Sequence, residues 1–127
     1  MIITETRAPW INNLGDVPAT LDYFRGYEAV EKIAQKYPEY IAYDFMGRST
    51  TYKKFVEQIN LCARALKAIG IREGDKITIC MPNCPQTVIM FYAVNLVGGI
   101  ANMVHPLSSE KEIEFYLKES GSICALT

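Results

Sequence analysis

The most reactive side chains in the sequence belong to four cysteines and one histidine. The cysteines stand at positions 62, 80, 84 and 124, and their spacing matches no CxxC-type zinc pattern. We therefore expect reduced, mostly buried thiols. The alternative is a metal site formed by Cys80, Cys84 and His105, because thiolate and imidazole groups both bind zinc.

His105 follows a predicted strand, at the sheet edge where α/β proteins bind their ligands. Catalysis by histidine needs a partner acid or nucleophile. The nearby Ser108 and Ser109 suit the start of the next helix better than they suit catalysis. Four carboxylates and two lysines share a face of that helix that we expect to be solvated: Glu110, Glu112, Glu114, Glu119, Lys111 and Lys118. The residues alone therefore predict no catalytic, cofactor-binding or metal-binding set.

Common phosphate-binding and nucleophile motifs are absent from the sequence. It contains no GxxxxGK[ST], no GxGxxG and no GxSxG. Gly98-Gly99 follows a predicted helix rather than opening one, so its N–H groups are not placed to meet a phosphate. A phospho-acceptor receiver domain would need carboxylates after its strands. The chain has Met81-Pro82 and Val104-His105 there, which excludes that interpretation.

Length and charge indicate one ordinary globular domain. The chain has 127 residues, of which 13 are basic and 14 acidic, giving a net charge of −1. A balance of this kind gives no electrostatic reason to expect nucleic acid as a partner. The first ten residues lack the apolar core of a secretory signal, so we expect a cytoplasmic protein.

The segment 77–109 contains no Asp, Glu, Lys or Arg. An uncharged apolar run of this length raises the question of a membrane span. Prolines, glycines and asparagines interrupt it too often for a spanning helix. We therefore expect no transmembrane segment, and interpret the run as two buried strands with a buried helix between them.

The first half of the chain predicts two amphipathic helices with a strand between them. In order, the predicted elements are an arm at 1–19, a helix at 27–37, a strand at 41–45, a turn at 46–48 and a helix at 52–69. Pro38 ends the first helix. Thr51 is the expected N-cap of the second helix, and Gly70 follows its end.

The second half predicts strands that alternate with helices. In order, these are a strand at 77–81, a helix at 85–97, a strand at 100–104, a helix at 110–119 and a strand at 123–126. Asn83 is the expected cap of the first of these helices, with Gln86 as its capping-box partner, and Ser109 with Glu112 forms a capping box for the second. This β-α-β-α-β order over 76–127 predicts an α/β fold, a doubly wound and mainly parallel sheet.

Such a sheet needs cover on both faces, and the chain has few helices to supply it. The helix at 85–97 is apolar nearly all round, so it needs neighbours on more than one side. We expect either a piece of a larger protein or an oligomer that covers these surfaces between chains. In an isolated chain, self-association through residues 85–104 would follow.

The order of short motifs resembles the N-terminal part of the AMP-forming acyl-CoA synthetases, in the adenylate-forming superfamily. The matching residues are Trp10 with Asp16-Val17-Pro18, Tyr37-Pro38, Ile41-Ala42, Thr51-Tyr52-Lys53-Lys54, Leu66 to Gly70, Gly74-Asp75-Lys76-Ile77, Met81-Pro82-Asn83, Gly98-Gly99-Ile100, Pro106-Leu107 and Lys118-Glu119-Ser120-Gly121. The opening, residues 10–23, resembles the long-chain fatty acid–CoA ligase branch. Two residues depart from the family pattern, namely Lys54 in place of an acid and His105 in place of Asn.

The resemblance implies a parent enzyme that activates a carboxylic acid with ATP and Mg²⁺ and passes the acyl group to coenzyme A. The motifs that do this are expected beyond Thr127, so no catalytic residue is assigned and the chain alone is expected to be inactive. Residues 20–127 would then be part of the N-terminal subdomain, with the rest of the parent chain as partner. Peripheral membrane association of the parent is compatible with the resemblance. The alternative is a stand-alone α/β interaction module without catalysis.

Overall fold

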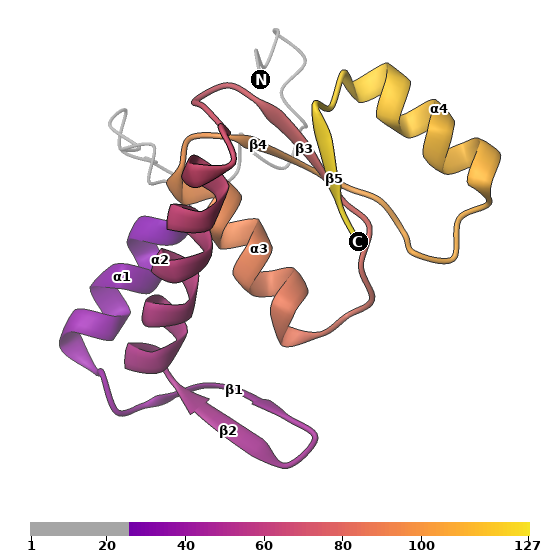
Figure 1. Ribbon diagram of the computed structural model, residues 1–127. Coiled ribbons are helices and arrows are strands. Elements are labelled where there is room, and N and C mark those ends of the chain that lie inside the picture. The colour runs from indigo at the N-terminus through magenta and orange to yellow at the C-terminus, as the bar shows by residue number, and fades with distance from the viewer. Residues whose placement is uncertain (1–25) are drawn as a thin grey trace, which may run out of the picture.

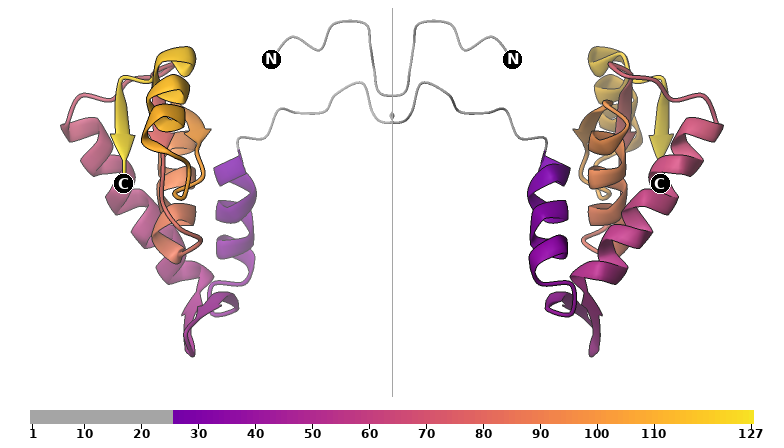
Figure 2. Two further views of the ribbon diagram at one scale, coloured as in Figure 1. Left: turned by 90° about the vertical axis from the view of Figure 1, so that its right-hand side faces the viewer. Right: turned by 90° about the vertical axis from the view of Figure 1, so that its left-hand side faces the viewer.

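The computed structural model describes residues 26–127. The predicted arm at 1–19 lies outside the described residues. The described part contains four helices, an antiparallel hairpin and a parallel sheet of three strands (Figure 1). In both turned views, the hairpin projects at the end of the molecule opposite the parallel sheet (Figure 2).

The predicted elements of the first half are confirmed, with one strand added. They are α1 (Gly26–Lys36), β1 (Ile41–Phe45), β2 (Arg48–Thr51) and α2 (Tyr52–Ala68). The sequence of β2 shows no apolar alternation, and this segment is a strand because it pairs with β1 across the turn. Met46 and Gly47 both have positive φ, 52° and 75°, as in the type I′ turns that match the twist of a hairpin.

Helix α2 supplies much of the core. Thr51 is its N-cap, and the Lys54 N–H donates to the Thr51 hydroxyl oxygen at 3.3 Å, as predicted. The buried residues of α2 are Phe55, Ile59, Ala63 and Leu66, which recur at the spacing of one helix face. Gly70, at φ 99°, follows the end of the helix in a conformation that favours glycine.

The second half forms the predicted β-α-β-α-β unit. Its elements are β3 (Lys76–Ile79), α3 (Pro85–Leu96), β4 (Ile100–Met103), α4 (Glu110–Ser120) and β5 (Cys124–Leu126). Strand β3 is central, and it pairs in parallel with β4 on one side and β5 on the other. Helix α3 packs with α1 and α2, whereas α4 lies on the other side of the sheet (Figure 1). The sheet is therefore doubly wound, which confirms the predicted fold class.

The two caps predicted in this half have different outcomes. The Ser109–Glu112 capping box of α4 is present. The prediction that Asn83 caps α3 is wrong, because the helix begins at Pro85 and Cys84 is its N-cap, without a side-chain cap bond. Cys84 is fully extended, at φ −143° and ψ 165°, which is the conformation that a following proline imposes. Asn83 therefore stands one residue too early to cap.

The two faces of the sheet are covered unequally. Ile77 and Ile79 are fully buried in the core, together with Ile59 of α2 and Val94 of α3. On the α4 side, no residue of the helix is fully buried. Ile113, Tyr116 and Leu117 recur at the spacing of one face of α4, which predicts that all three face the sheet. Ile113 and Leu117 are half-buried, but Tyr116 is 41% exposed, so this helix covers its face loosely.

Candidate functional site

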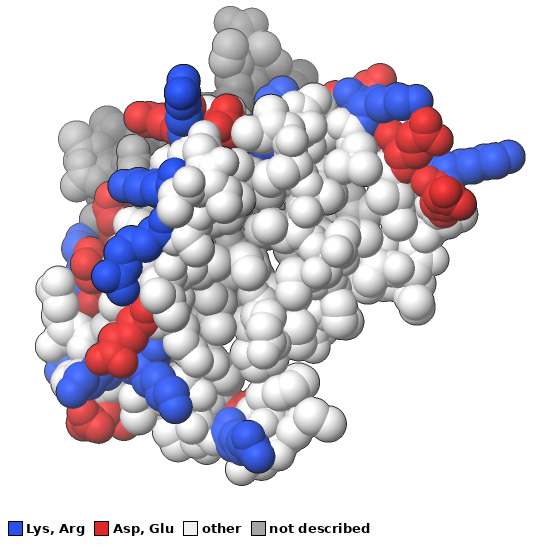
Figure 3. Space-filling model, viewed as in Figure 1, with Lys and Arg blue, Asp and Glu red and all other residues white. Residues whose placement is uncertain are grey.

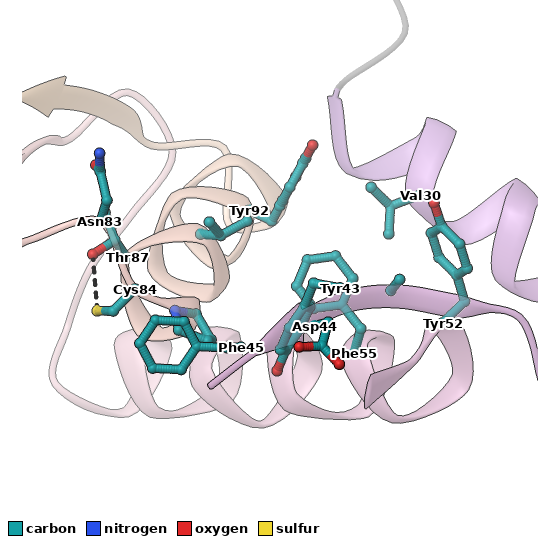
Figure 4. A pocket seen from close by; sticks show the side chains of 13 residues that line it. Val30, Tyr43, Asp44, Phe45, Tyr52, Phe55, Asn83, Cys84, Thr87 and Tyr92 are labelled. Carbon is teal, nitrogen blue, oxygen red and sulfur yellow. Dashed lines mark hydrogen bonds between the residues drawn. The ribbon is translucent and has the colours of Figure 1, made fainter. Parts of the chain in front are cut away.

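An apolar groove lies between the hairpin and the N-terminal half of α3, closed at its other end by α1 and α2 (Figure 4). We call it the aromatic groove, and its volume is about 460 Å³. Its lining residues are Val30, Ala42, Tyr43, Asp44, Phe45, Tyr52, Phe55, Asn83, Cys84, Pro85, Thr87, Val88 and Tyr92. Five of these are aromatic, and Asp44 is the one Asp, Glu, Lys or Arg among them.

Packing between three elements, β1, α2 and α3, holds the aromatic rings of the groove. Tyr43 and Phe45 stand two residues apart on β1, so their side chains point to the same face of the strand. The Phe55 ring packs edge-on against Tyr43 at 5.4 Å between centroids and against Tyr92 at 5.9 Å. The Tyr43 hydroxyl donates to Gln58 Oε1 on α2 at 3.1 Å. These contacts fix the groove as a preformed apolar surface.

Several polar groups of the groove make local hydrogen bonds. The Ser49 hydroxyl donates to the Asp44 carboxylate at 2.7 Å. The Thr87 hydroxyl donates to the Pro82 carbonyl, so Thr87 Oγ1 can accept from the Cys84 S–H, 3.4 Å away (Figure 4). No lining acid or base faces the thiol in a catalytic pair. The lining of the groove is therefore mainly apolar, and it contains no nucleophile paired with an acid or base.

The proposed metal ligands do not come together. The Cys80 thiol reaches the carbonyl oxygen of His105 at 3.9 Å, and not its ring. The His105 ring turns into its own loop, where Nδ1 accepts from the Leu107 N–H at 3.1 Å, and the Cys84 thiol faces Thr87. Among residues 26–127, no group of three or more His, Cys, Asp or Glu could hold a metal ion. The Cys80, Cys84 and His105 alternative therefore has no geometric support.

The four cysteines are free, and each is half-buried. The prediction that they are mostly buried is wrong. The cysteines stand at the margins of the core: Cys62 faces Met90, with 3.1 Å between the sulfurs, and Cys124 is on the short edge strand β5. Burial raises the pKa of both Cys62 and Cys124, which favours their protonated, unreactive form.

The serines and carboxylates around α4 have structural roles. Ser109 Oγ accepts from the Glu112 N–H at 3.4 Å, and Glu112 Oε2 accepts from the Ser109 N–H at 2.7 Å. The Lys118 ammonium contacts Glu114 at 2.6 Å on the exposed side of the helix. Ser108 and His105 line a smaller hollow with Tyr116 and Asn102, where neither has an acidic partner. The charged face of α4 was predicted to be solvated, and its four glutamates and two lysines are all exposed.

A comparison with models of protein families shows which family the chain belongs to. The family model described as "AMP-binding enzyme" matches residues 30–127, which is most of the chain. This chain belongs to the AMP-binding enzyme family. The predicted resemblance to the adenylate-forming ligases is thereby confirmed.

Curated relatives of this family member include long-chain-fatty-acid–CoA ligases. One from Bacillus subtilis is 34% identical over 87 residues, which are 68% of this chain and 16% of the relative. One from Yersinia pestis is 33% identical over 112 residues, which are 85% of this chain and 20% of the relative. The chain thus spans about a fifth or less of the length of these relatives.

Solved structures of two other proteins share the fold. The N-terminal subdomain of Klebsiella oxytoca NpsA has a TM-score of 0.77 at 24% identity, over 80% of this chain and 27% of that one. The N-terminal domain of FACL13 from Mycobacterium tuberculosis has a TM-score of 0.74 at 28% identity, over 78% of this chain and 25% of that one. The matched parts therefore belong to N-terminal domains. In the described part of this family member, no helix is long and apolar enough to cross a membrane.

The aromatic groove was missed by the sequence analysis. The sequence contains part of the signal for this groove, since Tyr43 and Phe45 alternate along β1 and Phe55 stands on the apolar face of the amphipathic helix α2. The sequence did not indicate that β1 would lie against the start of α3, which is what brings Cys84 and Val88 to the same groove.

Proposed function

We propose that this chain is the N-terminal scaffold portion of an acyl-CoA synthetase that joins a fatty carboxylic acid to coenzyme A through an acyl-adenylate. The observation that carries the proposal is the family match over 30–127, and the long-chain-fatty-acid–CoA ligase relatives support its substrate class. In such a protein, the parallel sheet and helices α1 to α3 form a structural framework that positions the other segments.

ATP, Mg²⁺ and coenzyme A do not fit the residues of this chain. Its described part holds no grouped oxygen ligands for Mg²⁺, and its sequence has no glycine-rich phosphate loop. We therefore assign the binding of all three to other segments of the protein, and the 127-residue chain alone should not activate a fatty acid. We also infer a cytoplasmic protein whose parent contacts membranes only peripherally.

The test begins with the source gene, read past the codon for Thr127. We expect an open frame that soon encodes a Ser/Thr/Gly-rich loop ending in Lys-Gly. ATP–pyrophosphate exchange with a fatty acid is then measured for the full product and for the 127-residue chain. Exchange by the full product alone supports the proposal.

Two results would contradict it. A stop codon directly after Thr127 would favour the alternative, a stand-alone interaction module that uses the same fold without catalysis. Exchange by the 127-residue chain would show that the scaffold role is wrong, because the residues that bind ATP would then have to lie within this chain.

A further inference from the structure

The turn between β4 and α4 has a histidine at its first position. The turn is formed by residues 105–108, with Pro106 second, and the Ser108 N–H donates to the His105 carbonyl oxygen at 3.1 Å. The first position of such a turn favours Asn, Asp or Ser, because their side chains accept from the N–H two residues later. The His105 ring makes the same contact, since its Nδ1 accepts from the Leu107 N–H at 3.1 Å.

The imidazole ring differs from the amide and hydroxyl groups usual at this position, because it gains a proton in the physiological range. Histidine ordinarily changes its charge between about pH 5 and 8. A protonated imidazole has an N–H group on each nitrogen and no acceptor left. Only the neutral ring of His105 can therefore accept from Leu107. His105 is also the only histidine among the 127 residues.

This turn leads directly into α4, the helix that covers its face of the sheet loosely. Ser109 follows the turn as the N-cap of the helix. No residue of α4 is fully buried, and hydrogen bonds of Ser120 and Ser122 tie its far end to β3. The start of α4 therefore depends on the turn and the cap more than on apolar packing.

We propose that His105 is a pH-dependent switch in this turn. With a neutral ring it holds the Leu107 N–H and positions the start of α4, and protonation in weak acid releases the turn and loosens the first turn of the helix. Because only the neutral ring accepts, the hydrogen bond stabilises the turn above the range in which the ring titrates and is lost as the pH falls through that range. The inference does not depend on the enzymatic role proposed above, because it concerns only described residues of this chain.

The groups around the ring leave its proton uncompensated. His105 borders a hollow of about 340 Å³ at the end of β4, whose other lining residues carry no charge at neutral pH: Asn102, Met103, Val104, Ser108 and Tyr116. The Cys80 thiol, just after β3, contacts the His105 carbonyl oxygen at 3.9 Å and not the ring. The first turn of α4 contains Glu110, Lys111 and Glu112, and Ser109 occupies the Glu112 carboxylate. Figure 3 shows charged side chains gathered over α2 and α4, with a largely uncharged surface between them. Within residues 26–127, no carboxylate pairs with the ring to hold it protonated.

The test compares wild type with His105→Asn in the full product of the source gene. Asn Oδ1 stands as many bonds from the backbone as His Nδ1 does, so this variant keeps an acceptor for the Leu107 N–H and loses the titration. Millisecond hydrogen exchange, read by mass spectrometry over peptides that cover 104–113, is measured at about pH 7.5 and about pH 5.5. Each rate is divided by the rate of the unfolded chain at the same pH.

In wild type, the corrected exchange of this segment should be about three- to tenfold faster at the lower pH, which is the factor that the loss of one ordinary hydrogen bond represents. His105→Asn should show no such acceleration. His105→Ala has no acceptor, so at the higher pH it should already exchange about as fast as wild type does at the lower pH. Peptides from α2, measured in the same samples, check that each variant keeps the fold.

Three results would overturn the proposal. Equal exchange of the wild-type segment at both pH values would show that protonation does not release the turn. An acceleration in His105→Asn as large as in wild type would show that another group titrates. Protection of the segment in His105→Ala equal to that of wild type at the higher pH would show that the ring does not hold the turn.

Discussion

Single side chains fix the ends and crossings of the helices. Asn95 of α3 accepts the Tyr27 N–H at 3.0 Å, and Asn60 of α2 donates to the Tyr27 hydroxyl at 3.0 Å, so one tyrosine links three helices. At α4, the Ser109 N–H and hydroxyl both donate to the Glu112 carboxylate. The Ser109 N–H and then its hydroxyl lower the pKa of Glu112 below its ordinary value of 4.5, because these donors stabilise the charged form.

This pKa shift predicts a pH dependence of stability. A carboxyl with a depressed folded pKa stabilises the protein above its unfolded pKa, and that contribution is lost as the pH falls through the folded value. In Glu112→Gln the acceptor remains but the charge does not. The variant should therefore be less stable than wild type near neutral pH, with the difference vanishing as the pH falls below about 4. Thermal unfolding at several pH values measures this.

The matched control is Glu110→Gln, which changes the same charge in the same turn but keeps the capping box. It should track wild type more closely than Glu112→Gln does. A stability difference for Glu112→Gln that is the same at all pH values would contradict the role given to the charged carboxylate.

At the scale of elements, strand β3 has an apolar face that packs in the core and an opposite face that makes hydrogen bonds. Ile77 and Ile79 point to the apolar side with α2 and α3, while Thr78 between them is buried on the α4 side. Asn102 Nδ2 donates to the Thr78 hydroxyl oxygen at 3.0 Å, and the Thr78 hydroxyl donates to Ser122 Oγ at 2.8 Å. Ser120 then continues this chain of hydrogen bonds, 2.7 Å from Ser122. Polar contacts therefore tie the end of α4 and the loop before β5 to the central strand β3.

Thr78→Val tests these contacts, because valine keeps the shape and removes the hydroxyl. The change leaves the Asn102 amide and the Ser122 hydroxyl without their Thr78 partner. We expect a loss of about 1–3 kcal/mol in the free energy of unfolding, measured by urea denaturation. The matched control is Thr50→Val on the hairpin, which should stay within about 0.5 kcal/mol of wild type. Equal effects of the two substitutions would contradict the importance of the buried chain of hydrogen bonds.

The whole molecule has one well-packed side and one loose side. The core cluster draws on α1, α2, α3 and β3, whereas no residue of α4 is fully buried. Several large apolar side chains remain exposed on the loose side, among them Leu107, Phe115 and Ile123. Regions with few buried apolar contacts open locally at a lower free energy than the core does.

Hydrogen exchange should reveal this asymmetry. Amides of α4 and β5 should exchange before those of α2 and α3, with rates at least about tenfold higher, which corresponds to about 1.4 kcal/mol in local opening. Mass spectrometry of peptides from each helix measures the rates. Equal protection of α3 and α4 would show that the polar contacts of Thr78 and Ser122 hold the loose side as firmly as the core.

Local signals in the sequence determined most of the elements. Periodicity defined α2, Pro38 ended α1, and the Ser109–Glu112 pair marked the start of α4, because each of these effects acts between residues close in the chain. The order of strands and helices then restricted the sheet to a doubly wound form, since right-handed crossovers leave few alternatives. The motif order was sufficient to indicate the family.

Only the tertiary structure decided which surfaces meet. The link between Tyr27 and Asn95 spans 68 positions, and β2 is a strand only because β1 lies beside it. The aromatic groove combines side chains of β1, α1, α2 and α3, and no local preference encodes that meeting. Such contacts depend on how complete helices and strands fit against one another when they pack. For that reason the sequence predicted the helices and strands, and the fold alone revealed the groove beside Met46.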